Sequence, residues 1–152
     1  MQARIDNPAL TVPGALTALR DLATAGKQAG VPETTMELVR LRASQINSCS
    51  GCVDLHSRAL KLAGESDARI NMVAAWRDAS YFTDAERAAL LLTETVTRVA
   101  DRGDPVPDEV WAEVSRHYDE QGLSGLLIAI TSINVWNRLN AATRQPAGAW
   151  TP

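Results

Sequence analysis

Residues 37–56 read ELVRLRASQINSCSGCVDLH, and they contain both cysteines of the 152-residue chain. Cys49 and Cys52 are three positions apart, and His56 follows Cys52 by four positions. Residues four apart on a helix share a face, so Cys52 and His56 are predicted to be neighbours. CxxC spacing also brings two sulfurs close enough to form a disulfide. Thiol redox chemistry is therefore the first hypothesis for this chain.

The composition is that of a soluble globular domain. The chain is 45% hydrophobic and 22% charged, with a net charge of −3, which gives no reason to expect nucleic acid or an anionic membrane as a partner. No secretory signal is recognisable, and the apolar run around 126–130 is too short to span a bilayer. A cytoplasmic location is expected, where a CxxC pair is more often catalytic or metal-binding than a permanent disulfide.

The apolar spacing is helical nearly throughout, so we predict one all-α domain over 1–152. Its core should cover about 15–142, and the tail 143–152 is expected to be poorly ordered unless a neighbouring subunit holds it. Breaks and caps separate the helices, including Ser66 and a capping box at Thr83–Glu86. The expected helices run from Pro13-Gly14 to 26–30, from Pro32 to about Ile46, from 49–52 to 64, from 66–67 to 76, through 88–99, from 108 to 118 and from 123 to about 142.

Three kinds of side chain favour an activated thiol. A helix N-terminus lowers the pKa of a thiol, and Cys49 and Cys52 lie where the third helix should begin. His56 can exchange a proton near neutral pH. Glu37 lies twelve residues before Cys49, and its carboxylate would reach the pair if the two helices pack antiparallel across Asn47-Ser48. Thiol, imidazole and carboxylate together make a proton relay.

Other interpretations of these residues exist. Cys49, Cys52 and His56 could supply three zinc ligands and Glu37 a fourth, since His117 is expected to be distant and exposed. Taken singly, His56 is an ordinary helix residue and Glu37 a surface carboxylate paired with Arg40 or Arg42. The joint spacing of these residues, rather than either residue taken singly, favours the redox hypothesis.

The residues also resemble a known family. Glu37, eleven residues, Cys49-x-x-Cys52, three residues and His56 are similar to the signature of the alkylhydroperoxidase AhpD-like family, within the carboxymuconolactone decarboxylase superfamily. The resemblance extends through Trp76-Arg77 to the INVWNRL segment at 133–139, and covers about 15–142.

The resemblance implies an all-helical homo-oligomer (dimer, trimer or hexamer) that reduces hydroperoxides as an antioxidant peroxidase, with no metal, haem or other cofactor. It implies that Cys52 is the peroxidatic thiol and Cys49 the more accessible, resolving thiol. His56 and Glu37 would form the proton relay. The implied partners are a hydroperoxide and a dithiol reductant such as a lipoylated protein. The sulfenic acid on Cys52 would condense with Cys49 before further oxidation.

Two features modify these expectations. Dipole reasoning alone favours Cys49 as the more acidic thiol, whereas the family and the nearby His56 favour Cys52. Members with the best-described peroxidase activity have a histidine where this chain has Gly51. A disulfide oxidoreductase, or a redox-sensing adaptor without turnover, is therefore the alternative function. Lactone decarboxylation is disfavoured, because that branch of the superfamily does not use a CxxC pair.

Several residues are expected to be structural. The tryptophans at 76, 111 and 136 should pack in the core or at a subunit interface. Asn134, Asn137 and Arg138 are polar among apolar neighbours in the last helix, and we expect them to be buried hydrogen-bonding or interface residues.

Overall fold

The computed structural model describes residues 2–101 and 103–148, and its regular secondary structure within these ranges is entirely helical. The all-α prediction is confirmed. In chain order the elements are α1 (Pro8–Thr11), α2 (Ala15–Lys27), α3 (Glu33–Ile46), α4 (Ser50–Leu62), α5 (Asp67–Met72), the 3-10 turn η1 (Val73–Ala75), α6 (Asp84–Thr97), the 3-10 turn η2 (Val99–Asp101), α7 (Asp108–Ser115) and α8 (Glu120–Thr143).

Side-chain caps start several helices where the sequence predicts them. The Thr83–Glu86 capping box precedes α6, and the Ser66 hydroxyl accepts from the Arg69 N–H at the start of α5. The short α1 was not predicted, although Asn7 caps it and proline occupies its first position. The last helix begins three residues earlier than expected, because the Asp119 carboxylate accepts from the Gly122 N–H.

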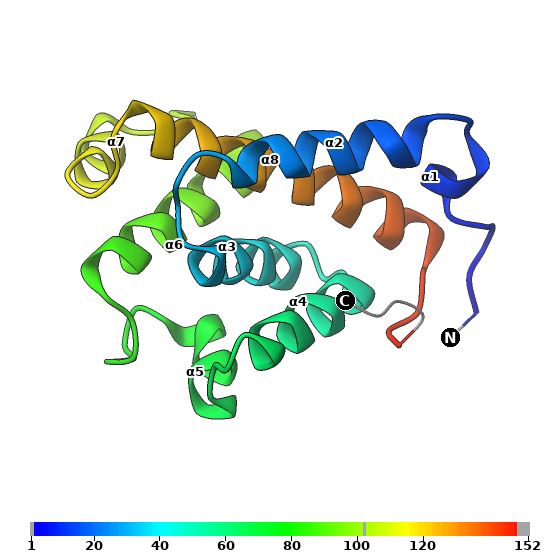
Figure 1. Ribbon diagram of the computed structural model, residues 1–152, viewed down its shortest axis with the longest axis horizontal. Coiled ribbons are helices and arrows are strands. Elements are labelled where there is room, and N and C mark those ends of the chain that lie inside the picture. Colours follow the sequence, from blue (N-terminus) through cyan, green and yellow to red (C-terminus); the bar gives the residue numbers. More distant parts are fainter. Residues whose placement is uncertain (1, 102, 149–152) are drawn as a thin grey trace.

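Helix α3 lies at the centre of the molecule. It packs against α4, α6 and α8, while α2 lies along α8 (Figure 1). Its apolar side chains contribute to two core clusters: Met36 and Val39 pack with residues of α6 and α8, and Leu38 and Leu41 pack with Leu60 and the α5 region. Because neighbours surround α3, several of its polar side chains are buried as well, namely Thr35, Glu37, Arg40 and Ser44.

The turn between α3 and α4 sets the position of the CxxC motif. Asn47 ends α3, and Ser48 adopts the left-handed conformation with φ of 55°. The Cys49 N–H then donates to the Ser44 carbonyl across 3.0 Å, which closes the end of α3. The predicted break at Asn47-Ser48 is confirmed. The reversal lets α4 run back along α3, which is the packing that the expected reach of Glu37 required (Figure 1).

The C-terminal segment returns to α4. Helix α8 continues through Thr143, the first residue of the expected tail, and the Gly148 N–H donates to Asp54 Oδ2 across 3.0 Å. Residues up to 148 therefore have defined contacts within this chain. The remaining tail residues, 149–152, lie outside the described residues.

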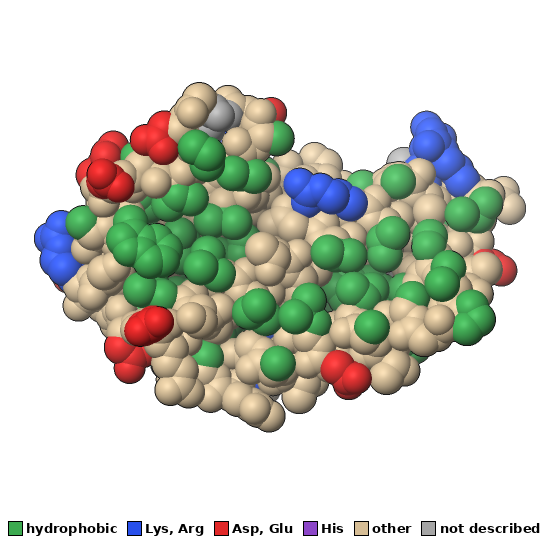
Figure 2. Space-filling model, turned by 90° about the horizontal axis from the view of Figure 1, so that it is seen from above, with side chains coloured by type: hydrophobic (Ala, Val, Ile, Leu, Met, Phe, Trp, Pro, Cys, Tyr) green, Lys and Arg blue, Asp and Glu red, His purple; other side chains and the backbone are tan. Residues whose placement is uncertain are grey.

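The tryptophans have different environments. Trp76 is buried and donates its indole N–H to Glu94 Oε1, which confirms its expected core position. Trp111 of α7 is 43% exposed, and Leu10 and Val12 near α1 are also exposed. Figure 2 shows the face that is uppermost in Figure 1, where hydrophobic side chains gather toward both ends of the molecule. Among the described residues, no helix combines the length and apolarity needed to cross a membrane.

Candidate active site

The two cysteines form a disulfide at the start of α4. Cys49 is the N-cap residue, and its Sγ accepts from the Cys52 backbone N–H at 3.3 Å. The Cα atoms are 5.3 Å apart. Both sulfurs lie at the positive end of the α4 dipole, which favours a thiolate after reduction. Cys49 is only 2% exposed and Cys52 4%, so the chain does not give Cys49 the greater accessibility that the resemblance implied.

Glu37 and His56 meet between α3 and α4, as the sequence predicted. His56 Nδ1 lies 2.8 Å from Glu37 Oε2, and both side chains are about nine-tenths buried. Glu37 Oε1 accepts from Arg40 Nη1 at 2.5 Å. Burial raises the pKa of Glu37, but the hydrogen bond and charge of His56 and the charge of Arg40 outweigh it. The pKa of Glu37 is therefore below its ordinary value.

The charge on Glu37 decides which nitrogen of His56 carries the proton. An ionised carboxylate can only accept hydrogen bonds, so His56 Nδ1 must be the donor. In the neutral imidazole this leaves Nε2 as the acceptor. The pair can therefore take up a proton at His56 Nε2 while Glu37 holds the ring in place.

Arg40 lies at the candidate site, in an environment that sequence reasoning missed. It was expected only as a surface partner of Glu37, but it is 5% exposed. It donates to Glu37 and, at 3.2 Å, to Glu33, which is half exposed. Its Nη2 atom is buried without a hydrogen-bond partner among the described residues. Its i, i+3 spacing from Glu37 was visible in the sequence, but its burial follows from the central position of α3.

A cavity of about 290 Å³ opens beside the motif, and both Cys52 and His56 line it, whereas Cys49 does not. Glu37 is not part of the wall, but its two partners, His56 and Arg40, are. Trp136, expected to be a packing residue, forms part of the wall. The lining residues are Leu16, Arg20 and Ala23 of α2, Arg40 of α3, Gly51, Cys52, Leu55 and His56 of α4, and Ser132, Ile133, Trp136 and Asn140 of α8.

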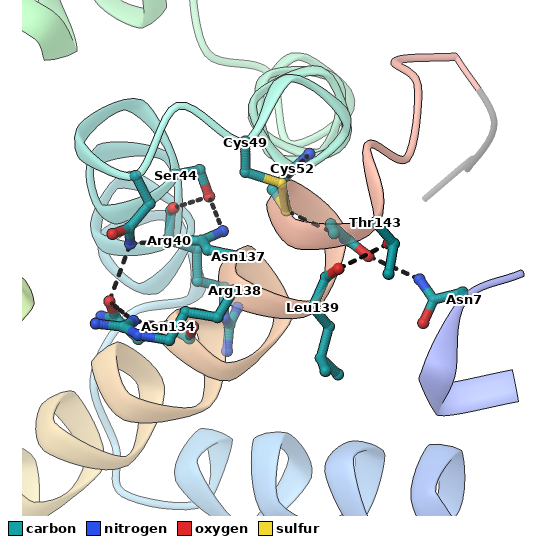
Figure 3. The surroundings of a disulfide bond; sticks show 12 residues. Asn7, Arg40, Ser44, Cys49, Cys52, Asn134, Asn137, Arg138, Leu139 and Thr143 are labelled. Carbon is teal, nitrogen blue, oxygen red and sulfur yellow. Dashed lines mark hydrogen bonds between the residues drawn. A yellow bond between two sulfur atoms is a disulfide. The ribbon is translucent and has the colours of Figure 1, made fainter. Parts of the chain in front are cut away.

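Asn140 contacts the motif from the end of α8, and the sequence analysis did not identify it. Its Nδ2 donates to Cys52 Sγ at 3.3 Å, and Asn7 Nδ2 donates to its Oδ1 at 2.7 Å. Figure 3 shows this part of the site, where Asn7 and the disulfide both face the end of α8. These residues are 133 and 88 positions from Asn140, so no local pattern indicates the contacts.

Other polar residues of α8 hold the α3–α4 turn. Asn137 is fully buried, donates to Ser44 Oγ at 3.0 Å and accepts from Asn47 Nδ2 at 2.9 Å. Asn134 also accepts from Asn47, and from Arg138. The prediction of buried hydrogen-bonding groups is confirmed for Asn134 and Asn137, whereas Arg138 is exposed and contacts Asn134 from the surface.

The candidate zinc ligands adopt a different arrangement. The sulfurs are bonded to each other, and His56 Nδ1 contacts Glu37. Over 2–101 and 103–148, no three His, Cys, Asp or Glu side chains are grouped as a metal-binding set. His117 lies apart from the motif and pairs with Glu113 at 3.4 Å.

Comparison with known proteins places this arrangement in a family. The family model described as "Carboxymuconolactone decarboxylase family" matches residues 12–95, which include Glu37, the CxxC motif and His56. The chain belongs to the carboxymuconolactone decarboxylase family.

Relatives support the assignment. An uncharacterized Bacillus subtilis protein, YdfG, is 35% identical over 130 residues, covering 86% of this chain and 87% of its own. A solved structure from Agrobacterium tumefaciens, described as of unknown function and provisionally as the antioxidant defence protein AhpD, has a TM-score of 0.89 and 31% identity. It covers 98% of this chain and 100% of its own. The debrominase Bmp8 shares the fold, with a TM-score of 0.79 at 19% identity over 90% of this chain and 73% of its own. The fold of this family member is therefore AhpD-like.

Proposed function

We propose that this chain is a thiol-dependent hydroperoxide reductase, an antioxidant peroxidase of the AhpD-like type. Cys52 is the attacking thiol, Cys49 the resolving thiol, and His56 with Glu37 the proton relay. One observation carries the proposal: Cys52 and His56 line the same cavity, while Cys49 lies within disulfide distance behind that wall. A substrate in the cavity would meet a thiol and a proton carrier together.

The reaction has two steps in the protein. The Cys52 thiolate attacks the terminal oxygen of ROOH, the O–O bond breaks, and the leaving alkoxide takes a proton from the relay to give ROH. Cys52 is then a sulfenic acid. Cys49 attacks the Cys52 sulfur, water leaves with the sulfenic oxygen, and the disulfide seen here forms. An external dithiol returns two electrons and two protons.

The cavity wall favours an organic hydroperoxide over hydrogen peroxide. Leu16, Leu55, Ile133 and Trp136 give it a large apolar area, and apolar surface stabilises a bound ligand only when the ligand has apolar surface to bury. An alkyl or aryl group would contact these side chains, whereas hydrogen peroxide would leave most of the cavity to water.

The reductant and the assembly belong to the same proposal. A small dithiol, such as the lipoyl group of a lipoylated protein in a reducing compartment like the cytoplasm, can supply the electrons. Self-association of the chain is supported by its exposed apolar side chains, among them Leu10, Val12 and Trp111.

The test is rapid mixing of the reduced protein with one equivalent of cumene hydroperoxide, and separately of hydrogen peroxide. We expect two thiols to be lost faster with cumene hydroperoxide. Cys52→Ser should be inert, and Cys49→Ser should stop after gaining one oxygen atom in the intact mass. Thiol loss no faster than that of a free thiol would reject the peroxidase and leave the disulfide oxidoreductase or the redox sensor. Turnover with dihydrolipoamide distinguishes those two.

A further inference from the structure

We propose that Asn140 stabilises the Cys52 thiolate by a hydrogen bond, and that Asn7 holds the Asn140 amide in the orientation that makes this possible. Asn140 would then act directly on the reacting sulfur, and Asn7 would be a positioning residue in a different part of the chain. The inference rests on the proposed function only in taking Cys52 as the reacting thiol.

The first support is the contact with the sulfur. Asn140 Nδ2 lies 3.3 Å from Cys52 Sγ, within the range for a hydrogen bond to sulfur. Asn140 is 7% exposed and Cys52 4%, so water competes little for either atom. Both residues line the cavity beside the motif. The amide is therefore placed where it would contact the sulfur during the reaction.

The second support is that the orientation of both amides follows from the backbone. The Ala9 backbone N–H can only donate, and it donates to Asn7 Oδ1 at 3.0 Å. The Asn7 Nδ2 group must then face Asn140, and it donates to Asn140 Oδ1 at 2.7 Å. The Asn140 Nδ2 group is left to face Cys52. Three successive hydrogen bonds, donated by Ala9, Asn7 and Asn140, therefore connect α1 to the sulfur.

The segment that carries Asn7 is attached to the end of α8. The Arg4 N–H donates to the Thr143 carbonyl at 2.9 Å, and Gln145 Nε2 donates to the Ile5 carbonyl at 3.0 Å. Asn7 itself is 3% exposed. These bonds keep α1 in register with α8, so the amide of Asn140 has a fixed neighbour.

The chemistry of sulfur makes this donor selective. A disulfide sulfur and a thiol are weak acceptors, whereas a thiolate accepts a charge-assisted bond that is about twice as strong as a neutral one. The amide therefore stabilises the thiolate more than the other forms of Cys52. This effect of the amide is added to that of the α4 N-terminus. The charged or titratable side chains at the same cavity are His56 of α4, Arg40 of α3 and Arg20 of α2, and Glu37 lies behind them.

The experiment measures the ionisation of Cys52 alone. In a Cys49→Ser background, the thiolate absorbance is followed against pH for the parent and for Asn140→Leu, Asn140→Asp and Asn7→Asp. Losing one hydrogen bond to a charged group should raise the midpoint by roughly one pH unit in Asn140→Leu. The rise should be larger in Asn140→Asp, because its carboxylate would also repel the thiolate. Asn7→Asp still accepts from Ala9 but cannot donate. The Asn140 amide should then turn its oxygen toward the sulfur, and the midpoint should rise as well.

Two controls separate the effect of the Asn7–Asn140–Cys52 hydrogen bonds from other effects on the midpoint. Thr93→Val removes a buried hydroxyl that donates to the Ala89 carbonyl within α6, away from the sulfur, and should leave the midpoint within about 0.2 units. The double variant Asn7→Asp with Asn140→Leu should show the midpoint of Asn140→Leu alone. A further rise in the double variant would mean that the new charge acts through space, and would overturn the role of Asn7.

The proposal fails if both Asn140→Leu and Asn7→Asp, folded as judged by circular dichroism, keep the parental midpoint. This failure is distinct from failure of the proposed function, because no peroxide is present in the titration. A slow reaction with cumene hydroperoxide together with raised midpoints would reject the peroxidase and keep Asn140 as the thiolate donor.

Discussion

His56 Nδ1 and Glu37 Oε2 are 2.8 Å apart and belong to two different helices, α4 and α3. Their contact joins an imidazole at the cavity to a buried carboxylate. The hydrogen bond and charge of His56, together with Arg40 at the second oxygen, hold the pKa of Glu37 below its ordinary value, so the carboxylate keeps its charge although it is buried. The ring of His56 is thereby fixed, with its Nε2 available as the proton acceptor.

Glu37→Gln should impair the peroxide step without unfolding the protein. The amide can still accept from Arg40, but its NH2 group then faces His56 Nδ1 and forces Nδ1 to accept, which moves the ring proton to Nε2. Loss of the base should slow thiol oxidation by organic hydroperoxide by about 10²–10⁴-fold, the range of general acid–base catalysis. Rapid-mixing kinetics of the reduced variant measure this.

Glu33→Gln is the matched control for that variant. Glu33 also contacts Arg40, at 3.2 Å, but half of its side chain is exposed and it does not touch His56. The rate of thiol oxidation in Glu33→Gln should stay within a few-fold of that of the parent. Equal decreases of the oxidation rate in both variants would show that the contacts of Arg40, rather than the position of the proton on His56, limit the reaction.

The local part of the site was predictable from the sequence, and the long-range part was not. The helical period places Cys52 with His56, and one short turn at Ser48 brings Glu37 beside them, so spacing alone indicated the group. Asn140 and Asn7 join the site only through the packing of the first and last helices. A single sequence gives no signal for which α8 residue will meet the sulfur.

Burial was the other quantity that the sequence could not give. An Arg three positions after a Glu is typical of an exposed helix face, and the burial of Arg40 depends on three helices covering α3. The capping signals, by contrast, act within one turn of their helices, which is why Thr83 and Ser66 were identified correctly.

Stability should decrease in acid because of Glu94. Burial raises the pKa of Glu94, but hydrogen bonds from Trp76, Arg77 and Arg42 outweigh this effect and hold the pKa below its ordinary value of 4.5. Between the folded pKa and 4.5 the unfolded chain binds more protons. The contribution of Glu94 to the free energy of unfolding should therefore be complete above pH 4.5, and should be lost as the pH drops through the folded pKa. Glu37 contributes in the same direction.

Urea unfolding at several pH values measures this effect. Glu94→Gln leaves its partly buried arginine partners without a full counter-charge, and should lower the free energy of unfolding near neutral pH by about 2 kcal/mol. The free energy of unfolding of this variant should also decrease less steeply in acid than that of the parent. Glu109→Gln, an exposed change in α7, should cost less than about 0.5 kcal/mol. A parallel decline in the Glu94 variant and the parent would exclude Glu94 as the cause.

Gly125→Ala should destabilise the contact between α8 and the end of α2. A Cβ atom on Gly125 would lie 2.2 Å from Ala29 Cβ and 3.1 Å from the Gly26 carbonyl, so the backbones must separate. Overpacking of this kind costs about 1–3 kcal/mol, which exceeds the roughly 1 kcal/mol that alanine gains over glycine in a helix. We expect a lower Tm. Gly51→Ala, whose Cβ would meet the Pro146 oxygen at an ordinary 3.4 Å, should not lower it, and a similar drop in both would contradict the steric account.

The C-terminal segment should slow the reduction of the disulfide. The carbonyls of Gln145 and Pro146 lie beside Gly51, between the two cysteines, and Asp54 Oδ2 accepts from the Gly148 N–H. A dithiol must reach a sulfur that is almost fully buried, so displacing this segment should help it. Asp54→Ala removes a hydrogen bond worth about 1 kcal/mol, which should raise the displaced population and the rate of reduction by dihydrolipoamide roughly fivefold. Asp54→Asn keeps an acceptor oxygen and should behave like the parent. If Asp54→Ala is reduced at the parental rate, the dithiol reaches the sulfurs through the cavity at Cys52, and the segment plays no part in access.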